Sequence, residues 1–167
     1  EGEGTTFTVD LPLIEAAAPD AAAAADGPGE SVVVMDRNPI ARGMLRTLLE
    51  PHFAAVQFAA TPEEALTMLP DTGPVLVLAE EATLKAAGDD ALAILTALTG
   101  VAKEKGARSA VLWVKPDEAM LALLAQAGAA TVVAKPVAGA ALVEALVAGR
   151  KEICATSTST RLVSEAA

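Results

Sequence analysis

Aromatic residues are nearly absent from this chain: they make up 2% of its 167 residues, and tyrosine does not occur. Apolar residues still account for 53% of the sequence, so the core is expected to consist mainly of alanine, valine and leucine. Because Cys154 is the single cysteine, no internal disulfide can form. This agrees with a reducing compartment, and the cytoplasm is the expected location.

The chain also has few basic residues. Its 12 lysines and arginines face 22 acidic residues, which gives a formal net charge of -10. A surface of that sign repels the phosphate backbone, so a nucleic-acid polymer is excluded as a partner. No apolar run of about 18 residues is free of charge, glycine or proline, and neither a membrane span nor a signal peptide is expected. The start without methionine suggests a piece of a longer protein.

Two kinds of segment alternate after an Ala-, Pro- and acid-rich stretch at 15–30, which is predicted to be a linker. The first kind is a short apolar run typical of a buried strand, and the second has apolar residues at helical spacing. The predicted strands are 31–35, 54–59, 74–79, 109–114 and 130–134. The predicted helices are 37–50, 61–69, 89–104, 116–128 and 139–150.

This alternation predicts a doubly wound α/β domain over residues 31–150, with a parallel sheet and helices on both faces. In such sheets, sites lie at the carboxyl ends of the strands, beside the point where strand order reverses. The Ser- and Thr-rich residues 151–167 are predicted to be a flexible tail or a linker to a further domain.

Two stretches resemble the receiver domains of two-component signalling: "VVVMDRNPIARGMLRTLLE" at 32–50 and "AGAATVVAKPV" at 127–137. The resemblance implies a five-stranded receiver or flavodoxin-like sheet with strand order 2-1-3-4-5. A working receiver needs an acidic pair that binds magnesium, an acceptor aspartate, a Thr or Ser hydroxyl, and a lysine. The cation and the ammonium neutralise charge on the transferred phosphoryl group.

By position, Asp36 matches the first acid, whereas Arg37 occupies the place of the second. Glu80 falls at the acceptor place, Val114 at the hydroxyl place, and Lys135 matches the lysine. The resemblance therefore implies a degenerate receiver, or pseudoreceiver, with no catalytic residue, metal or cofactor. Glu80 has three open interpretations: part of an ion cluster in which Arg37 stands in for the lost cation, a mimic of phosphoaspartate, or a true acceptor.

The segment "GEGTTFTVDLPL" at 2–13 resembles the end of the ATP-binding domain of histidine kinases. Residues 1–14 are therefore expected to close such a domain, and the parent protein is expected to be a hybrid histidine kinase. The fragment itself is expected not to be an enzyme. His52, the single histidine, lies in a predicted loop and lacks the context of a kinase phosphoacceptor.

Two functions of different class follow. The first is docking onto the kinase domains of the same parent protein, or onto a following receiver domain, through a surface that includes 116–128 and 139–150. The alternative is a sensor in which Arg108, Trp113 and Lys115 bind a cyclic dinucleotide, since basic residues concentrate there and an indole can stack on a purine. A working phosphoacceptor receiver is the third and least favoured reading.

Overall fold

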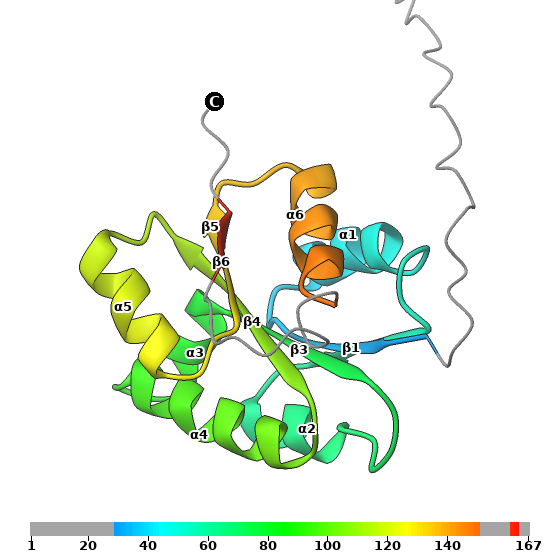
Figure 1. Ribbon diagram of the computed structural model, residues 1–167, viewed down its shortest axis with the longest axis horizontal. Coiled ribbons are helices and arrows are strands. Elements are labelled where there is room, and N and C mark those ends of the chain that lie inside the picture. The colour runs from blue at the N-terminus through cyan, green and yellow to red at the C-terminus, as the bar shows by residue number, and fades with distance from the viewer. Residues whose placement is uncertain (1–28, 151–160, 164–167) are drawn as a thin grey trace, which may run out of the picture.

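The computed structural model describes residues 29–150 and the backbone of Arg161–Val163 (Figure 1). The predictions for the N-terminal kinase segment, for most of the linker and for Cys154 lie outside these residues. Within the described part of the chain, no helix has both the length and the apolar character needed to cross a membrane.

The described residues form a parallel sheet flanked by helices. Its strands are β1 (Ser31–Met35), β2 (Ala55–Ala59), β3 (Val75–Glu80), β4 (Arg108–Val114), β5 (Thr131–Lys135) and β6 (Arg161–Val163). The helices are α1 (Pro39–Leu49), α2 (Pro62–Thr67), α3 (Glu81–Ala87), α4 (Ala91–Glu104), α5 (Glu118–Gln126) and α6 (Gly139–Ala148).

The order of the strands is β2-β1-β3-β4-β5-β6, and neighbouring strands pair in parallel. The predicted doubly wound fold and the 2-1-3-4-5 order of its five strands are therefore confirmed. The sixth strand was not expected: β6 pairs with β5 over three residues, so this part of the predicted flexible tail extends the sheet instead.

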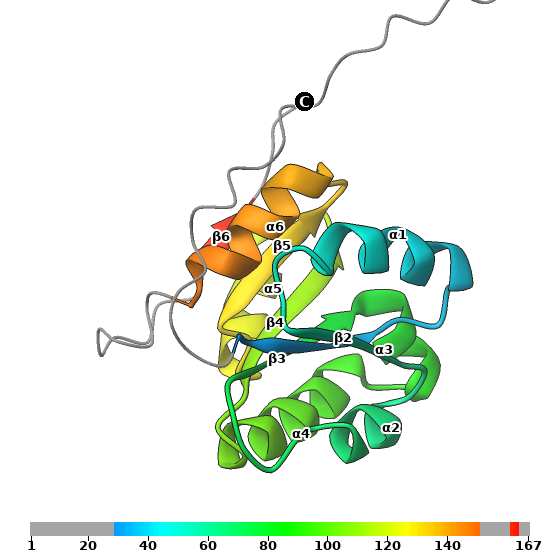
Figure 2. The same cartoon turned by 90° about the vertical axis from the view of Figure 1, so that its right-hand side faces the viewer.

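Helices α1 and α6 cover one face of the sheet, and α2 to α5 cover the other (Figure 2). Because consecutive side chains of a strand point to opposite faces, β1 contributes Val33 and Met35 to one core and Val32 and Val34 to the other. The buried aromatic residues of the described chain are Phe53 and Trp113, as the aliphatic composition predicts.

Local sequence signals place several helix ends. The Thr61 side chain accepts a hydrogen bond from the Glu64 backbone N–H at 3.2 Å, and Pro62 opens α2. Gly128 follows α5 with φ of 91°, a conformation that favours glycine, and a Cβ there would lie 2.7 Å from Thr99 Oγ1. Thr61 and Pro62 therefore mark the start of α2, and Gly128 marks the end of α5.

The region after β3 differs from the prediction of one helix near 89–104. The structure has two helices there, because Gly88 ends α3 and the Asp90 side chain caps α4 by accepting from the N–H groups of Leu92 and Ala93. Helix α3 begins directly at the end of β3, where Glu80 is its N-cap. This junction holds the acceptor-place glutamate at the carboxyl edge of the sheet.

An ion cluster joins elements at the opposite edge, where the strands begin. The buried Glu30 carboxylate accepts hydrogen bonds from Arg108, which is also buried, and from Arg150 Nε at 2.7 Å. Arg108 Nη2 further donates to the Leu146 carbonyl at 2.6 Å, and the Arg150 guanidinium lies 4.4 Å from the centre of the Phe53 ring. The cluster therefore ties the start of β1 to β4 and to the end of α6.

Replacing Glu30 with alanine leaves the buried Arg108 guanidinium without its carboxylate. We expect the Glu30→Ala variant to lose about 3 kcal/mol of unfolding free energy in urea titration. The control is Glu144→Ala, which removes an exposed glutamate from α6 and should change stability by about 0.5 kcal/mol or less. Equal, small losses in both variants would show that the cluster does not hold the fold.

Candidate functional site

Three ionisable side chains meet at the carboxyl ends of the strands, beside the point where strand order reverses. Asp36 follows β1, Glu80 ends β3 and Lys135 ends β5. The parallel register pairs Met35 with Ala79, and Glu80 with Leu112, so these strand ends lie at one level. The site falls where the rule for open α/β sheets places it.

Both oxygens of the Glu80 carboxylate accept hydrogen bonds within the chain. Its Oε1 accepts a hydrogen bond from Lys135 Nζ, and its Oε2 accepts from the Thr83 N–H at 2.8 Å and the Thr83 hydroxyl at 3.2 Å. Burial raises the pKa of Glu80, but the Lys135 ammonium and the N–H groups of Ala82 and Thr83 outweigh it and hold the pKa below its usual value. Glu80 is therefore an ionised cap of α3, paired with Lys135.

Asp36 is 4% exposed and holds the start of α1. Its Oδ1 accepts from the Asn38 N–H at 2.8 Å, and its carbonyl oxygen accepts from Arg42 Nε. Burial, joined by the neighbouring Glu80 charge, raises the pKa of Asp36 above its usual value, against the opposing effects of Asn38, Lys135 and Arg42. The folded protein therefore disfavours the ionised form of Asp36, whereas it favours the ionised form of Glu80.

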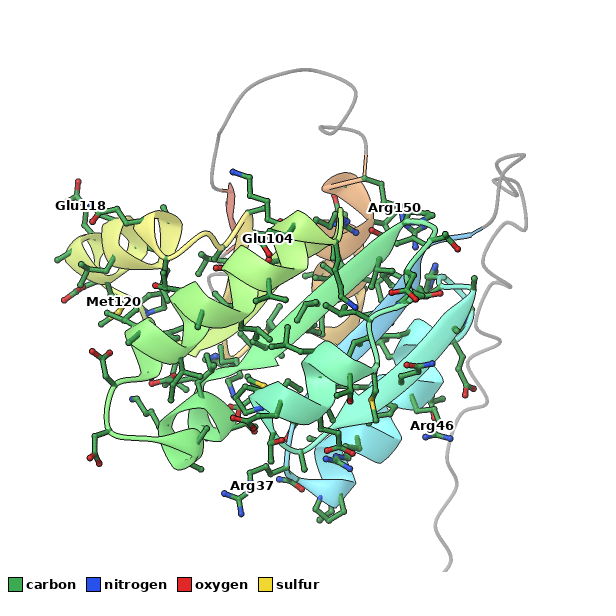
Figure 3. The ribbon with its side chains drawn as sticks, turned by 90° about the horizontal axis from the view of Figure 1, so that it is seen from below. Arg37, Arg46, Glu104, Glu118, Met120 and Arg150 are labelled. Atoms are coloured by element: carbon green, nitrogen blue, oxygen red, sulfur yellow. The ribbon has the colours of Figure 1, made fainter. Side chains whose placement is uncertain are left out.

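Arg37 does not take the position of the missing cation. Its backbone N–H donates to Thr83 Oγ1 at 3.0 Å, while its exposed side chain makes no ion pair with any residue that the structure describes. Figure 3 shows this side chain projecting away from the sheet. The expectation that Arg37 neutralises the pocket is corrected: Lys135 pairs with Glu80, and Arg42 lies beside Asp36.

Glu81 is a functional candidate that sequence reasoning missed. It is 7% exposed, its Oε2 accepts from the Val114 N–H at 2.6 Å, and its Oε1 accepts from Lys85. The Lys85 ammonium lies 5.5 Å from the centre of the Trp113 ring. The spacing of Glu81 and Lys85, four residues apart, was the available signal for a helix at this place. Glu81 therefore ties α3 to the end of β4.

Val114 occupies the hydroxyl place with a side chain that is 52% exposed, so only its backbone takes part in the site. The next residue, Lys115, has a positive φ of 42°, and its N–H donates to the Lys135 carbonyl at 3.4 Å. The two strand ends are thus joined by backbone contacts, without a side-chain hydroxyl.

The residues proposed for a cyclic dinucleotide do not come together. Arg108 starts β4 and is bound in the Glu30 cluster, whereas Lys115 follows the other end of that strand. Trp113 is 5% exposed and packs in the core under α3 and α4. Arg108 is already paired with a buried carboxylate and Trp113 lies in the core, so the three residues do not form one site.

The residues present also do not fit the magnesium ion that a receiver-like fold implies. Across the described residues, no group of three or more His, Cys, Asp or Glu side chains is arranged to hold a metal. Magnesium requires several oxygen ligands in octahedral geometry. Here Arg37 replaces one carboxylate, and both oxygens of Glu80 already accept hydrogen bonds.

Comparisons with known proteins identify the fold. No protein-family model and no curated protein matches the sequence. The receiver domain of the Saccharomyces cerevisiae response regulator Ssk1, crystallised with the phosphotransfer protein Ypd1, has a TM-score of 0.57 at 17% identity, covering 70% of this chain and 86% of that one.

Two further solved structures are similar to the same extent. A response regulator receiver protein from Pseudoalteromonas atlantica has a TM-score of 0.58 at 18% identity, covering 74% of this chain and 98% of that one. The isolated receiver domain of RcsB from Salmonella enterica has a TM-score of 0.58 at 19% identity, covering 72% and 87%. At these identities the similarity establishes a receiver-like fold.

Removing Lys135 leaves the Glu80 carboxylate buried without its ammonium. We expect Lys135→Met to lose about 2 kcal/mol of unfolding free energy, less than for a fully buried pair because the lysine side chain is 30% exposed. Adding Glu80→Gln to this variant should recover part of the loss, since the buried charge is then gone. The pairing would be contradicted if the double variant lost more unfolding free energy than the two single variants lose in total.

The two carboxylates should make the free energy of unfolding depend on pH in opposite directions. The pKa of Glu80 lies below its usual 4.5, so its ionised form stabilises the fold above that value and the benefit is lost as pH falls. The pKa of Asp36 lies above its usual 3.8, so its stability contribution is complete below that value and is lost as pH rises. Urea unfolding from about pH 6 to about pH 3 measures both contributions.

In that titration, Glu80→Gln should flatten the acid-side loss of stability. Asp36→Asn should be at least as stable as the unchanged chain at the upper end of the range. The assignment of the two carboxylates is wrong if the two variants exchange these behaviours.

Proposed function

We propose that this chain is a receiver-fold regulatory domain of a two-component hybrid histidine kinase, that it accepts no phosphoryl group, and that it acts by docking to other domains of its parent protein. The observation that carries the proposal is the state of Glu80. Its carboxylate already accepts hydrogen bonds from Lys135 and Thr83. A nucleophile must instead present a free oxygen in line with the phosphoryl group.

The surrounding positions support the same proposal. The hydroxyl that would contact a phosphoryl oxygen is replaced by the Val114 side chain, and the end of β4 is held by the Glu81 carboxylate instead. A strand end fixed by internal carboxylates favours a domain with one persistent surface, which suits docking.

The partners are proposed from two sources. The N-terminal resemblance to a histidine kinase suggests the kinase domains of the same parent chain, or a receiver domain that follows. In addition, the structurally similar Ssk1 receiver was crystallised with a histidine phosphotransfer protein, so a receiver fold can present a protein-binding surface. Both sources favour a protein partner over a small ligand.

The test is an NMR titration of the isotope-labelled chain with magnesium and beryllium fluoride, a mimic of the phosphoryl group. We expect no saturable shift of the amides of Asp36, Glu80 and Lys135, because the Glu80 oxygens are occupied and Arg37 replaces a metal ligand. The control is the Arg37→Asp/Glu80→Asp variant, which adds one carboxylate at position 37 and shortens the side chain at position 80 to aspartate, and it should gain a magnesium-dependent shift at Asp36. A saturable response of the unchanged chain would overturn the proposal.

A further inference from the structure

Strand β2 ends the sheet on one side. Among the described strands it pairs with β1 alone, whereas the other side of the sheet is extended by β6, which pairs with β5. Helix α1 lies on one face of β2 and α2 on the other (Figure 2). The remaining side of β2, in the plane of the sheet, faces no further strand of the described chain.

The contacts with β1 show which backbone groups of β2 face outward. The Ala59 carbonyl accepts from the Asp36 N–H at 3.1 Å, so the backbone groups of Ala59 point toward β1. The register between the two strands is regular from the Ser31–Ala55 pair to the Met35–Ala59 pair. Because the backbone groups of consecutive strand residues point to alternate sides, those of Val56 and Phe58 point away from β1. Such a row of groups is a template for a strand of another chain.

β2 lacks the features that keep an edge strand from pairing with another chain. Edge strands are commonly protected by charged side chains, by proline or by a bulge. The sequence of β2 is Ala-Val-Gln-Phe-Ala, and its regular register with β1 contains no bulge. Charged residues make up 20% of the whole chain, and its net charge is -10. At this uncharged strand, two copies of the acidic chain can meet without placing like charges opposite each other.

The side chains of β2 are arranged symmetrically about Gln57. Gln57 itself is exposed, Val56 and Phe58 beside it are half-buried on the α1 face, and an alanine stands at each end. The Arg46 guanidinium of α1 lies 5.3 Å from the centre of the Phe58 ring, which holds the ring on that face. A strand with the same pattern in both directions matches itself when two copies pair antiparallel.

We propose that β2 pairs antiparallel with β2 of a second copy of this chain, about a two-fold axis at Gln57. In this register the outward N–H and carbonyl groups of Val56 bond to those of Phe58 on the other copy. The Val56 side chain also lies directly opposite the Phe58 side chain, and a β-branched residue opposite an aromatic one stabilises an antiparallel pair. The same patch serves both copies, as a two-fold dimer requires, and the two sheets become one.

This inference goes beyond the proposed function, because the partner is a second copy of the chain and not another domain of its parent protein. The β6 side of the sheet suits such pairing less well. β6 is three residues long, and very short edge strands are protected against pairing with other chains.

Analytical ultracentrifugation of the full chain tests whether the dimer forms. We expect a reversible equilibrium in which the dimer fraction rises with protein concentration. Because both copies carry the same net charge, raising salt from about 50 mM to about 500 mM screens their repulsion and should strengthen the association. A chain that stays monomeric up to about 1 mM would overturn the proposal.

Amide hydrogen exchange measured by NMR locates the interface. The N–H groups of Val56 and Phe58 should exchange fast in dilute samples and slowly in concentrated ones, since the second copy alone protects them. The N–H groups of Gln57 and Ala59 face β1 and should be protected in both samples. A dimer without this alternating pattern has its interface elsewhere, and the proposal is then wrong.

The variants Gln57→Lys and Gln57→Glu place like charges opposite each other at the two-fold axis. Each variant alone should dimerise about fivefold more weakly than the unchanged chain, because like charges directly opposite each other destabilise a strand pair. An equal mixture of the two variants should form a heterodimer at least as stable as the unchanged dimer, because opposite charges then meet. Thermal melting of each variant checks that it is folded.

The matched controls are Gln126→Lys and Gln126→Glu, which make the same changes in net charge. Gln126 is the exposed last residue of α5, and this helix connects β4 to β5, away from β2. Neither control should weaken the association about fivefold, and mixing the two controls should have no effect. Equal effects at positions 57 and 126 would show that net charge alone governs the association, and the proposed strand pairing would be rejected.

Discussion

The pair formed by Glu80 and Lys135 is the contact around which the carboxyl edge of the sheet is organised. Glu80 ends β3 and Lys135 ends β5, so the pair spans the end of β4, which lies between them. The same glutamate caps α3 through the Thr83 N–H. The hydroxyl of Thr83 in turn accepts from the Arg37 N–H, which brings the chain leaving β1 into the network. One carboxylate therefore fixes three strand ends and a helix.

Charge balance explains why this arrangement is self-contained. The buried carboxylates at this edge are Asp36, Glu80 and Glu81. Glu80 pairs with Lys135 and Glu81 pairs with Lys85, whereas Arg42 donates to the backbone carbonyl of Asp36. Two of these three carboxylates are therefore paired with cations of the chain itself. Buried ion pairs contribute little net stability because desolvation opposes their attraction, but they are costly to break. The network thus specifies one arrangement of the strand ends more than it stabilises the fold as a whole.

Strands β1, β3, β4 and β5 could be predicted because their apolar runs are buried on both faces, and the strand order followed from the resemblance at 32–50 and 127–137. The prediction of one helix near 89–104 omits α3, because it does not use Gly88 as a helix stop and Asp90 as a new cap. Arg37 was assigned to the pocket because it stands next to Asp36 in sequence. Adjacent residues point in different directions, and Arg42, one helical turn into α1, lies beside Asp36 instead. The spacing of Glu81 and Lys85 indicates a helix, but the contact of Glu81 with the backbone N–H of Val114 on β4 leaves no side-chain motif in the sequence.

The buried site and helix α1 are parts of one structure. Asp36 accepts from the Asn38 N–H with its carboxylate and from Arg42 with its carbonyl, so it fixes the first turn of α1. Asn38 in turn caps the helix by accepting from the N–H groups of Ile40 and Ala41. A position that binds metal in a working receiver here holds a helix in place. Under the proposed function the site does not respond to a phosphoryl group, so its contacts can be constant and helix α1 can keep one position.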